Sequence, residues 1–177
     1  MQAEDFFSAY LVLKENNEAF FERQADSSGK LLKEGTALGT HPTMGVEIVC
    51  LAFSVELYIK DLHYALKGKA PRGHNILKLF ETLPEQIQQE IFADDSISQN
   101  PFFTRGDIFS TKRFTSAYSA YDGFIDHIKA ISDGFEKWRY SYESRHLKYD
   151  VSFSLAFIEV VKSVSGKVRQ QSGIRND

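Results

Sequence analysis

Apolar residues recur every three or four positions along most of this chain, a spacing typical of amphipathic helices. The clearest run steps by three or four residues from Met44 to Leu66. Similar spacing marks 4–25, 76–80, 85–93, 111–142 and 150–171. The stretch 150–171 is rich in valine, so a β-strand is the alternative there, but the length of the stretch favours a helix. The pattern therefore predicts an all-α, single-domain bundle of four to five main helices spanning residues 1–177.

Several residues mark where the central helices begin and end. Pro42 fits a first helical turn, and Gly68 supplies a left-handed C-terminal end. Asn75 is placed to cap the short helix that follows. Thr82 and Glu85 have the spacing of a capping box that opens a helix to about residue 93. We expect loops at 27–41 and 94–110 and a frayed tail at 172–177.

Composition and charge narrow the classes of function. The hydrophobic content of 42% is that of a folded globular domain. The formal charge of −3 gives no overall basic field, so binding of nucleic acid requires a local patch. A single cysteine, Cys50, excludes an internal disulfide and a cysteine-rich metal site. With no signal peptide, no apolar run long enough to cross a membrane and no metal or cofactor motif, we expect a cytoplasmic protein without cofactor or metal.

The turn between the two central helices is a candidate phosphate site. Lysines and an arginine gather between positions 60 and 78, where the only acid is Asp61. We assign phosphate or nucleotide binding to Lys69, Arg72, His74 and Asn75, because Asn75 opens a helix whose free N–H groups can accept a phosphate. The alternative is an ordinary solvated turn in which His74 caps or packs.

Glu56 is a carboxylate within an apolar helix. Lys60 follows it by one turn and can form an ion pair with it. Burial among apolar neighbours requires a partner for the charge, for example an arginine. We expect Glu56 and Lys60 to be structural polar residues, and a functional carboxylate is the alternative.

Arg139 and His146 are the candidate catalytic residues. An arginine can hold a phosphate with two parallel hydrogen bonds, and a histidine can transfer a proton near neutral pH. Their separation by seven positions places them near one face if the helix continues. The alternative is a structural pair of Arg139 with Glu143, one turn away, and a surface position for His146.

The stretch AFSVELYIKDLHYALKGKAPRGHNILKLFETLP resembles the HEPN domain (higher eukaryotes and prokaryotes nucleotide-binding), a family of small helical bundles. Asn75 stands where the family has an aspartate, and FEKWRYSYE, at 135–143, resembles a block of a bacterial subgroup. The residues that carry the likeness are Ala52, Glu56, Leu57, Lys60, Gly73, His74, Leu77, Leu79 and Phe80.

This resemblance implies either of two functions. Many HEPN proteins are metal-independent endoribonucleases that act as homodimers through an Arg-x(4–6)-His motif, which Arg139 and His146 match. The resemblance would make His146 the general acid and base, and Arg139 the group that stabilises charge on the phosphate. Other members have lost catalysis and bind RNA, a nucleotide or a protein partner.

Two residues of the motif depart from the ribonuclease pattern. Tyr140 replaces the usual polar residue beside the arginine, and Glu143 lies inside the spacer, where its charge opposes RNA. We therefore expect a non-catalytic HEPN-like module in a bacterial stress or defence context, with an antitoxin or another protein as a further partner. The alternatives are a toxin-like ribonuclease and a structural interaction protein that docks a partner through Phe102 and Phe103.

Overall fold

The computed structural model describes residues 2–27, 45–104, 119–132 and 149–171, and every regular element in these ranges is a helix. This agrees with the predicted all-α class. The helices are α1 (Gln2–Ser27), α2 (Val46–Lys67), α3 (Ile76–Glu81), α4 (Glu85–Ala93), α5 (Asp95–Ser98), α6 (Pro101–Thr104), α7 (Ala120–Ile131) and α9 (Val151–Gln171).

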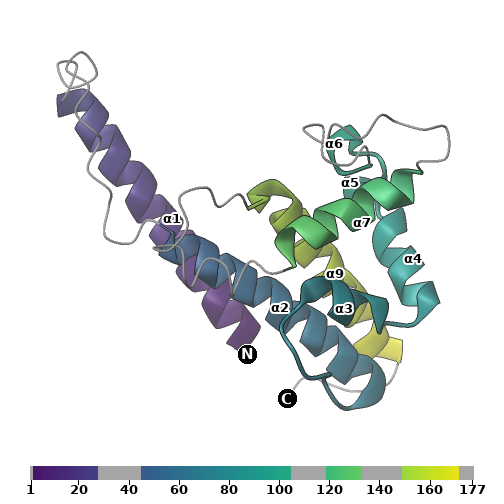
Figure 1. The fold of residues 1–177 in the computed structure, drawn as a ribbon. Coiled ribbons are helices and arrows are strands. Elements are labelled where there is room, and N and C mark those ends of the chain that lie inside the picture. The colour runs from purple at the N-terminus through teal and green to yellow at the C-terminus, as the bar shows by residue number, and fades with distance from the viewer. Residues whose placement is uncertain (1, 28–44, 105–118, 133–148, 172–177) are drawn as a thin grey trace.

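The long helix α2 is the centre of the arrangement (Figure 1). It packs against α9 and, through residues such as Phe53 and Tyr58, against α1, and α3 folds back onto its C-terminal half. Leu51, Ile59 and Leu62 of α2 are fully buried as a result. This explains the apolar character of α2 on most of its sides, because a helix covered by several neighbours has little surface left for polar residues.

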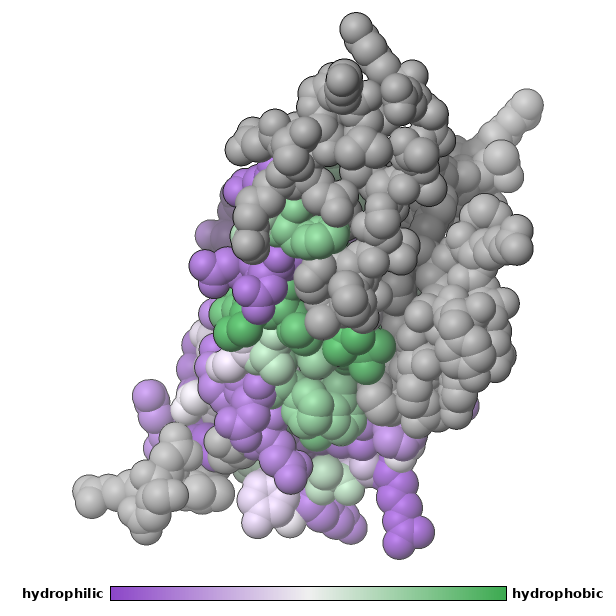
Figure 2. All heavy atoms as spheres, turned by 90° about the vertical axis from the view of Figure 1, so that its left-hand side faces the viewer, coloured by the Kyte–Doolittle hydropathy of each residue, from purple (hydrophilic) through white to green (hydrophobic). Residues whose placement is uncertain are grey.

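The N-terminal helix α1 is attached to α2 and α9 by rings and one carboxylate. Phe6 and Phe53 meet edge to face, with ring centroids 4.5 Å apart. The Tyr58 hydroxyl donates to Glu4, whose other oxygen lies 3.6 Å from Lys162 Nζ. Large exposed apolar side chains also lie on this pair of helices, namely Phe6, Leu11, Val12 and Val46. Figure 2, which faces the side of the molecule where α1 lies, shows apolar side chains gathered between hydrophilic ones.

A cluster of phenylalanine rings joins the shorter helices to α9. Phe124 of α7 lies 5.5 Å from Phe80 of α3 and 5.8 Å from Phe153 of α9, measured between ring centroids. It also lies 5.5 Å from Phe92 of α4. The many phenylalanines of the sequence thus fill the space where four helices meet.

The sequence signals at the ends of α2 and α3 have mixed outcomes. Gly68 ends α2 with a φ of 66°, and the Asn75 side chain accepts the Lys78 N–H, as predicted. The predicted capping box of Thr82 and Glu85 is wrong, because these residues do not cap α4. Thr82 instead ends α3 and its hydroxyl donates to the Leu79 carbonyl, and Pro84 stands before α4 without a side-chain cap.

Two predicted elements differ from the structure. The loop at 94–110 contains α5 and α6 in its described part, because Asp94 caps α5 through the Ser96 N–H. The single helix at 111–142 is interrupted, because Ser119 is extended and forms a capping box with Asp122 that starts α7. Phe103, expected to be exposed, is buried against His127 and Phe153, whereas Phe102 is 69% exposed.

The expected loop at 27–41 and the frayed tail at 172–177 lie outside the described residues, apart from Ser27, which ends α1. Among the described helices, none has both the length and the apolar character needed to cross a membrane.

Candidate functional site

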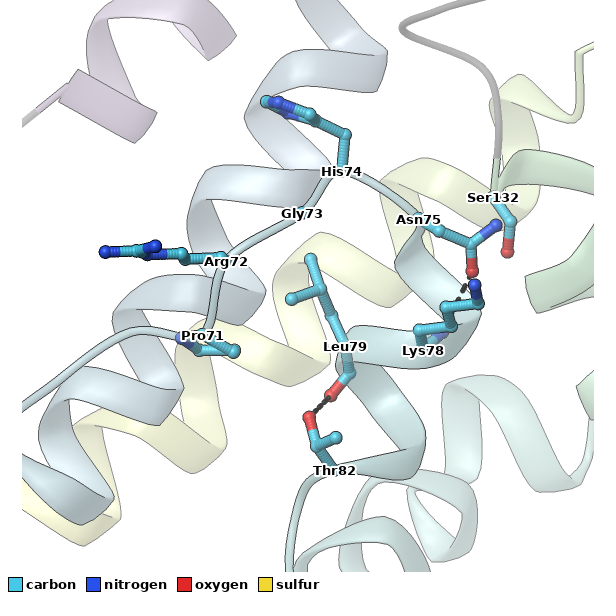
Figure 3. Close-up of a pocket in the computed structure, with 9 residues that line it drawn as sticks. All are labelled: Pro71, Arg72, Gly73, His74, Asn75, Lys78, Leu79, Thr82 and Ser132. Carbon is cyan, nitrogen blue, oxygen red and sulfur yellow. Dashed lines mark hydrogen bonds between the residues drawn. The ribbon is translucent and has the colours of Figure 1, made fainter.

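A cavity of about 460 Å³ lies beside the turn that joins α2 to α3 (Figure 3). Its walls come from this turn, from α3 and from the C-terminal end of α7. The lining residues are Pro71, Arg72, Gly73, His74, Asn75, Lys78, Leu79, Thr82 and Ser132. Three of the predicted phosphate-binding residues, Arg72, His74 and Asn75, are therefore brought to one cavity.

Gly73 sets the path of the chain through this turn. Its φ of +101° lies in the left-handed region, which residues with a Cβ rarely adopt. Open space surrounds the position of a Cβ, so the requirement for glycine comes from the backbone conformation alone. The following residues, His74 and Asn75, then point to opposite sides of the turn, as Figure 3 shows.

His74 is attached to α2 through Glu56. The Glu56 side chain is only 1% exposed, and the Nδ1 atom of His74 lies 3.0 Å from its Oε1 and 3.1 Å from its Oε2. The Lys60 Nζ lies 2.6 Å from the same Oε1. The predicted pair of Glu56 and Lys60 is present, and the further partner is a histidine rather than an arginine. This buried carboxylate ties the turn to α2.

The first N–H groups of α3 already have partners. The Ile76 N–H donates to the Ser132 carbonyl, the Leu77 N–H to the Ser132 hydroxyl and the Lys78 N–H to the Asn75 side chain. The expectation of free N–H groups at this helix end is wrong for that reason. These three N–H groups are therefore not available to a phosphate, and the charge for binding one must come from side chains.

The cations of the turn have no acidic partner among the described residues. Two carboxylates of α2 are already paired, because Glu56 lies against Lys60 and Asp61 lies 2.5 Å from Arg169. Within the described ranges, no carboxylate lies within ion-pair distance of the remaining cations, which are Lys67, Lys69, Arg72 and Lys78. The turn therefore carries a local positive charge on a chain whose formal net charge is −3.

The cations are distributed on several sides of the turn. In Figure 3 the Arg72 side chain extends away from Lys78, which lies on the opposite side of the cavity, beside Asn75 and Ser132. Lys69 lines a neighbouring cavity of about 160 Å³ instead, together with Lys67 and His63. Pro71 and Thr82 line both cavities. The arrangement suits a ligand with several anionic groups along its length better than a single enclosed phosphate.

His63 has a structural position between these cavities. It is 1% exposed, and its Nε2 atom lies 2.9 Å from the Leu79 carbonyl and 3.3 Å from the Thr82 hydroxyl. Burial lowers the pKa of His63, so the neutral ring donates one hydrogen bond to Leu79. His63 therefore attaches α3 to α2 and adds no charge to the turn.

Sequence reasoning missed Ser132 as part of this site. It lies 55 positions from Leu77, whose N–H it accepts. A small polar residue at a helix end gives no signal of so distant a partner.

Arg139, Glu143 and His146 lie outside the described residues, so their assignment stays a prediction. Among the described side chains, no group of three or more histidines, cysteines and acids is placed to hold a metal ion.

Comparisons of the chain with protein-family models, with curated proteins and with solved structures gave no match. A function for this chain must therefore be inferred from its own residues.

Proposed function

We propose that this chain is a HEPN-like helical module that binds RNA or a nucleotide through the turn between α2 and α3, without cleaving it. The observation that supports this most is the group of cations beside the cavity with no described acidic partner. We call the turn between α2 and α3, together with its cations Lys67, Lys69, Arg72 and Lys78, the basic turn. As in the family resemblance, the module acts as a homodimer.

The chemistry of these side chains suits phosphodiesters. An arginine can donate two parallel hydrogen bonds to a phosphate, and a lysine acts as a compact positive charge. Binding of a nucleic acid strand releases condensed counterions, so such contacts give an affinity that falls with salt. Because the α3 N–H groups are occupied, the charge on the side chains supplies most of this affinity.

The test is the binding of a short fluorescent RNA at several salt concentrations, measured by anisotropy. The variant Lys69→Gln/Arg72→Gln removes two cations of the basic turn. We expect at least a tenfold loss of affinity at low salt, and a salt slope that falls by about one for each phosphate that is no longer bound. The slope matters because it counts the bound phosphates separately from any loss of folded protein.

The matched control is Lys14→Gln/Lys129→Gln. These lysines are also on the surface, but they pair with Glu18 and Asp126 on their own helices. This control has the same change in net charge and should bind RNA as the unaltered chain does. Equal affinity in the control and in the basic-turn variant would contradict the proposal.

The ribonuclease alternative is motivated by the spacing of Arg139 and His146. The same RNA is incubated with the chain and with His146→Ala, and the products are separated by size. We expect no cleavage by either protein. Cleavage by the unaltered chain that His146→Ala abolishes would instead establish that the chain is an endoribonuclease.

A further inference from the structure

We propose that Tyr64 is a stacking platform for a base, so that the ligand of the basic turn is a single-stranded nucleic acid. This inference rests on the function proposed above and names the class of its ligand. Tyr64 lies in the last turn of α2, where its carbonyl accepts the Gly68 N–H at 2.8 Å. The chain enters the basic turn directly after it.

Tyr64 is the most exposed of the described tyrosines. It is 60% exposed, whereas Tyr10 and Tyr58 are buried in the core and the other described tyrosines, Tyr121 and Tyr149, are partly buried. Within the described ranges its ring makes no contact with another ring and lies under no cation. A largely exposed aromatic ring with no described ring or cation partner can offer a face to a ligand.

Tyr64 lies among positively charged residues on α2. Lys60 precedes it by four positions and Lys67 follows it by three, and both spacings place side chains next to each other on a helix surface. Lys67 donates to the Thr82 carbonyl at 3.1 Å, and its ammonium group keeps two further donors. The nearest acid on this helix, Asp61, is neutralised by Arg169. An exposed ring beside a lysine, with the nearest acid of its helix already paired, has the composition of a single-strand binding surface.

The charge of Lys60 does not add to this surface, because its Nζ lies 2.6 Å from Glu56. On the far side, Glu81 follows Lys78 by three positions without pairing with it, and its charge acts on Tyr121 of α7. The cations that can add to this surface are therefore Lys67, Lys69 and Arg72, and helical spacing places Lys67 next to Tyr64.

A single strand can place a base on Tyr64 while its neighbouring phosphates contact the cations. In a duplex the bases are already stacked on one another, so their faces are not available to a protein ring. Stacking recognises the flat face of any base, which predicts little preference for sequence. The chemistry is shared by single-stranded RNA and single-stranded DNA, and the test below includes both.

The test compares Tyr64→Ala, Tyr64→Leu and Tyr64→Phe. The probes are a single-stranded RNA, a DNA of the same sequence, the corresponding RNA duplex and inorganic polyphosphate. We expect Tyr64→Ala and Tyr64→Leu to weaken binding of both single strands by about 5- to 100-fold, which is the range for loss of one stacked base. Tyr64→Phe keeps the ring and should retain the affinity of the unaltered chain. Because Tyr64 is exposed, all three variants should unfold at nearly the same temperature.

Polyphosphate separates this inference from the proposed function. It has phosphates but no bases, so Tyr64→Ala should bind it normally, whereas Lys69→Gln/Arg72→Gln should not. The stacking inference is overturned if Tyr64→Ala binds single strands as the unaltered chain does, if Tyr64→Phe is as weak as Tyr64→Ala, or if the duplex is preferred. Absence of binding to every probe by the unaltered chain overturns the proposed function itself. If Tyr64→Ala loses more affinity for the RNA strand than for the DNA strand, RNA is identified as the ligand.

Discussion

Glu56 shows how a single buried charge can determine the position of a loop. A carboxylate that is 1% exposed has lost almost all of its hydration, and only partners within hydrogen-bond distance can offset this cost. Its partners are Lys60 on the same helix and His74 on the basic turn. The hydrogen bonding of His74 to Glu56 therefore holds the turn against α2.

We expect Lys60→Met to lower the free energy of unfolding by about 2–4 kcal/mol, because the buried Glu56 carboxylate then keeps only His74 as a partner. Lys14→Met is the matched control. It breaks the pair of Lys14 and Glu18, which has the same spacing but exposed side chains, and should cost less than about 0.5 kcal/mol. Urea unfolding at neutral pH measures both. Similar losses in the two variants would show that Glu56 does not depend on Lys60.

The sequence could indicate only half of this arrangement. The pair of Glu56 and Lys60 follows from their spacing on one helix, because helical geometry places such residues together. The contact of Glu56 with His74 joins residues 18 positions apart across a turn. Its existence depends on the path of the turn, which the left-handed Gly73 determines, and local patterns do not specify that path.

At the scale of elements, His127 joins three helices. Its Nδ1 atom lies 2.7 Å from Asp150 Oδ2, before α9, and its Nε2 atom lies 2.7 Å from the Phe102 carbonyl of α6. Both oxygens are acceptors when Asp150 is ionised, so both contacts are hydrogen bonds only if the ring carries a proton on each nitrogen. The ring also stacks on Phe153, with centroids 5.1 Å apart.

This junction predicts a loss of stability in acid. Burial would raise the pKa of Asp150, but the hydrogen bonds from His127 and from the Phe153 N–H outweigh it, so the pKa is lowered. A carboxyl with a lowered pKa stabilises the folded state above the ordinary range near pH 4, and this stability is lost as the pH falls through its folded pKa. Asp150→Asn should therefore be less stable than the unaltered chain by about 1–3 kcal/mol at pH 6, and the difference should shrink below about pH 4.

The measurement is the free energy of unfolding against pH for the two proteins. Asp5→Asn, on an exposed position of α1, is the control and should follow the unaltered chain at every pH. A difference between Asp150→Asn and the unaltered chain that persists undiminished at pH 3 would show that the Asp150 charge is not its source.

Most helices were predictable because their apolar spacing is local. The errors arose at short polar signals near helix ends, whose effect differs from one place to the next. Ser119 and Asp122 form a capping box that ends the continuity of the predicted helix at 111–142. The same kind of signal at Thr82 and Glu85 has no such effect, because the Thr82 hydroxyl binds the Leu79 carbonyl of the preceding helix instead. Only the surrounding packing distinguishes these two cases.

At the scale of the whole molecule, Phe124 connects helices that are distant in sequence. It is fully buried and contacts rings of α3, α4 and α9. The basic turn is attached to α3, so the geometry of the candidate site depends on this cluster. A core that joins four helices favours unfolding as one cooperative unit.

We expect Phe124→Ala to lower the free energy of unfolding by about 3–5 kcal/mol, since it removes a buried ring and leaves a cavity. Phe102→Ala deletes the same atoms at a position that is 69% exposed and should cost less than about 1 kcal/mol. Thermal unfolding followed by circular dichroism measures both. A small effect of Phe124→Ala would mean that these helices do not share one core.

Ser132 has a consequence for communication within the molecule. It caps the start of α3 with two of its atoms, and the next residue in the chain begins the stretch that carries Arg139 and His146. Ser132 thus connects α3, and through α3 the basic turn, to the point where that stretch begins. Were a ligand bound at one of the two candidate sites to change the affinity of the other, the effect would be equal in both directions.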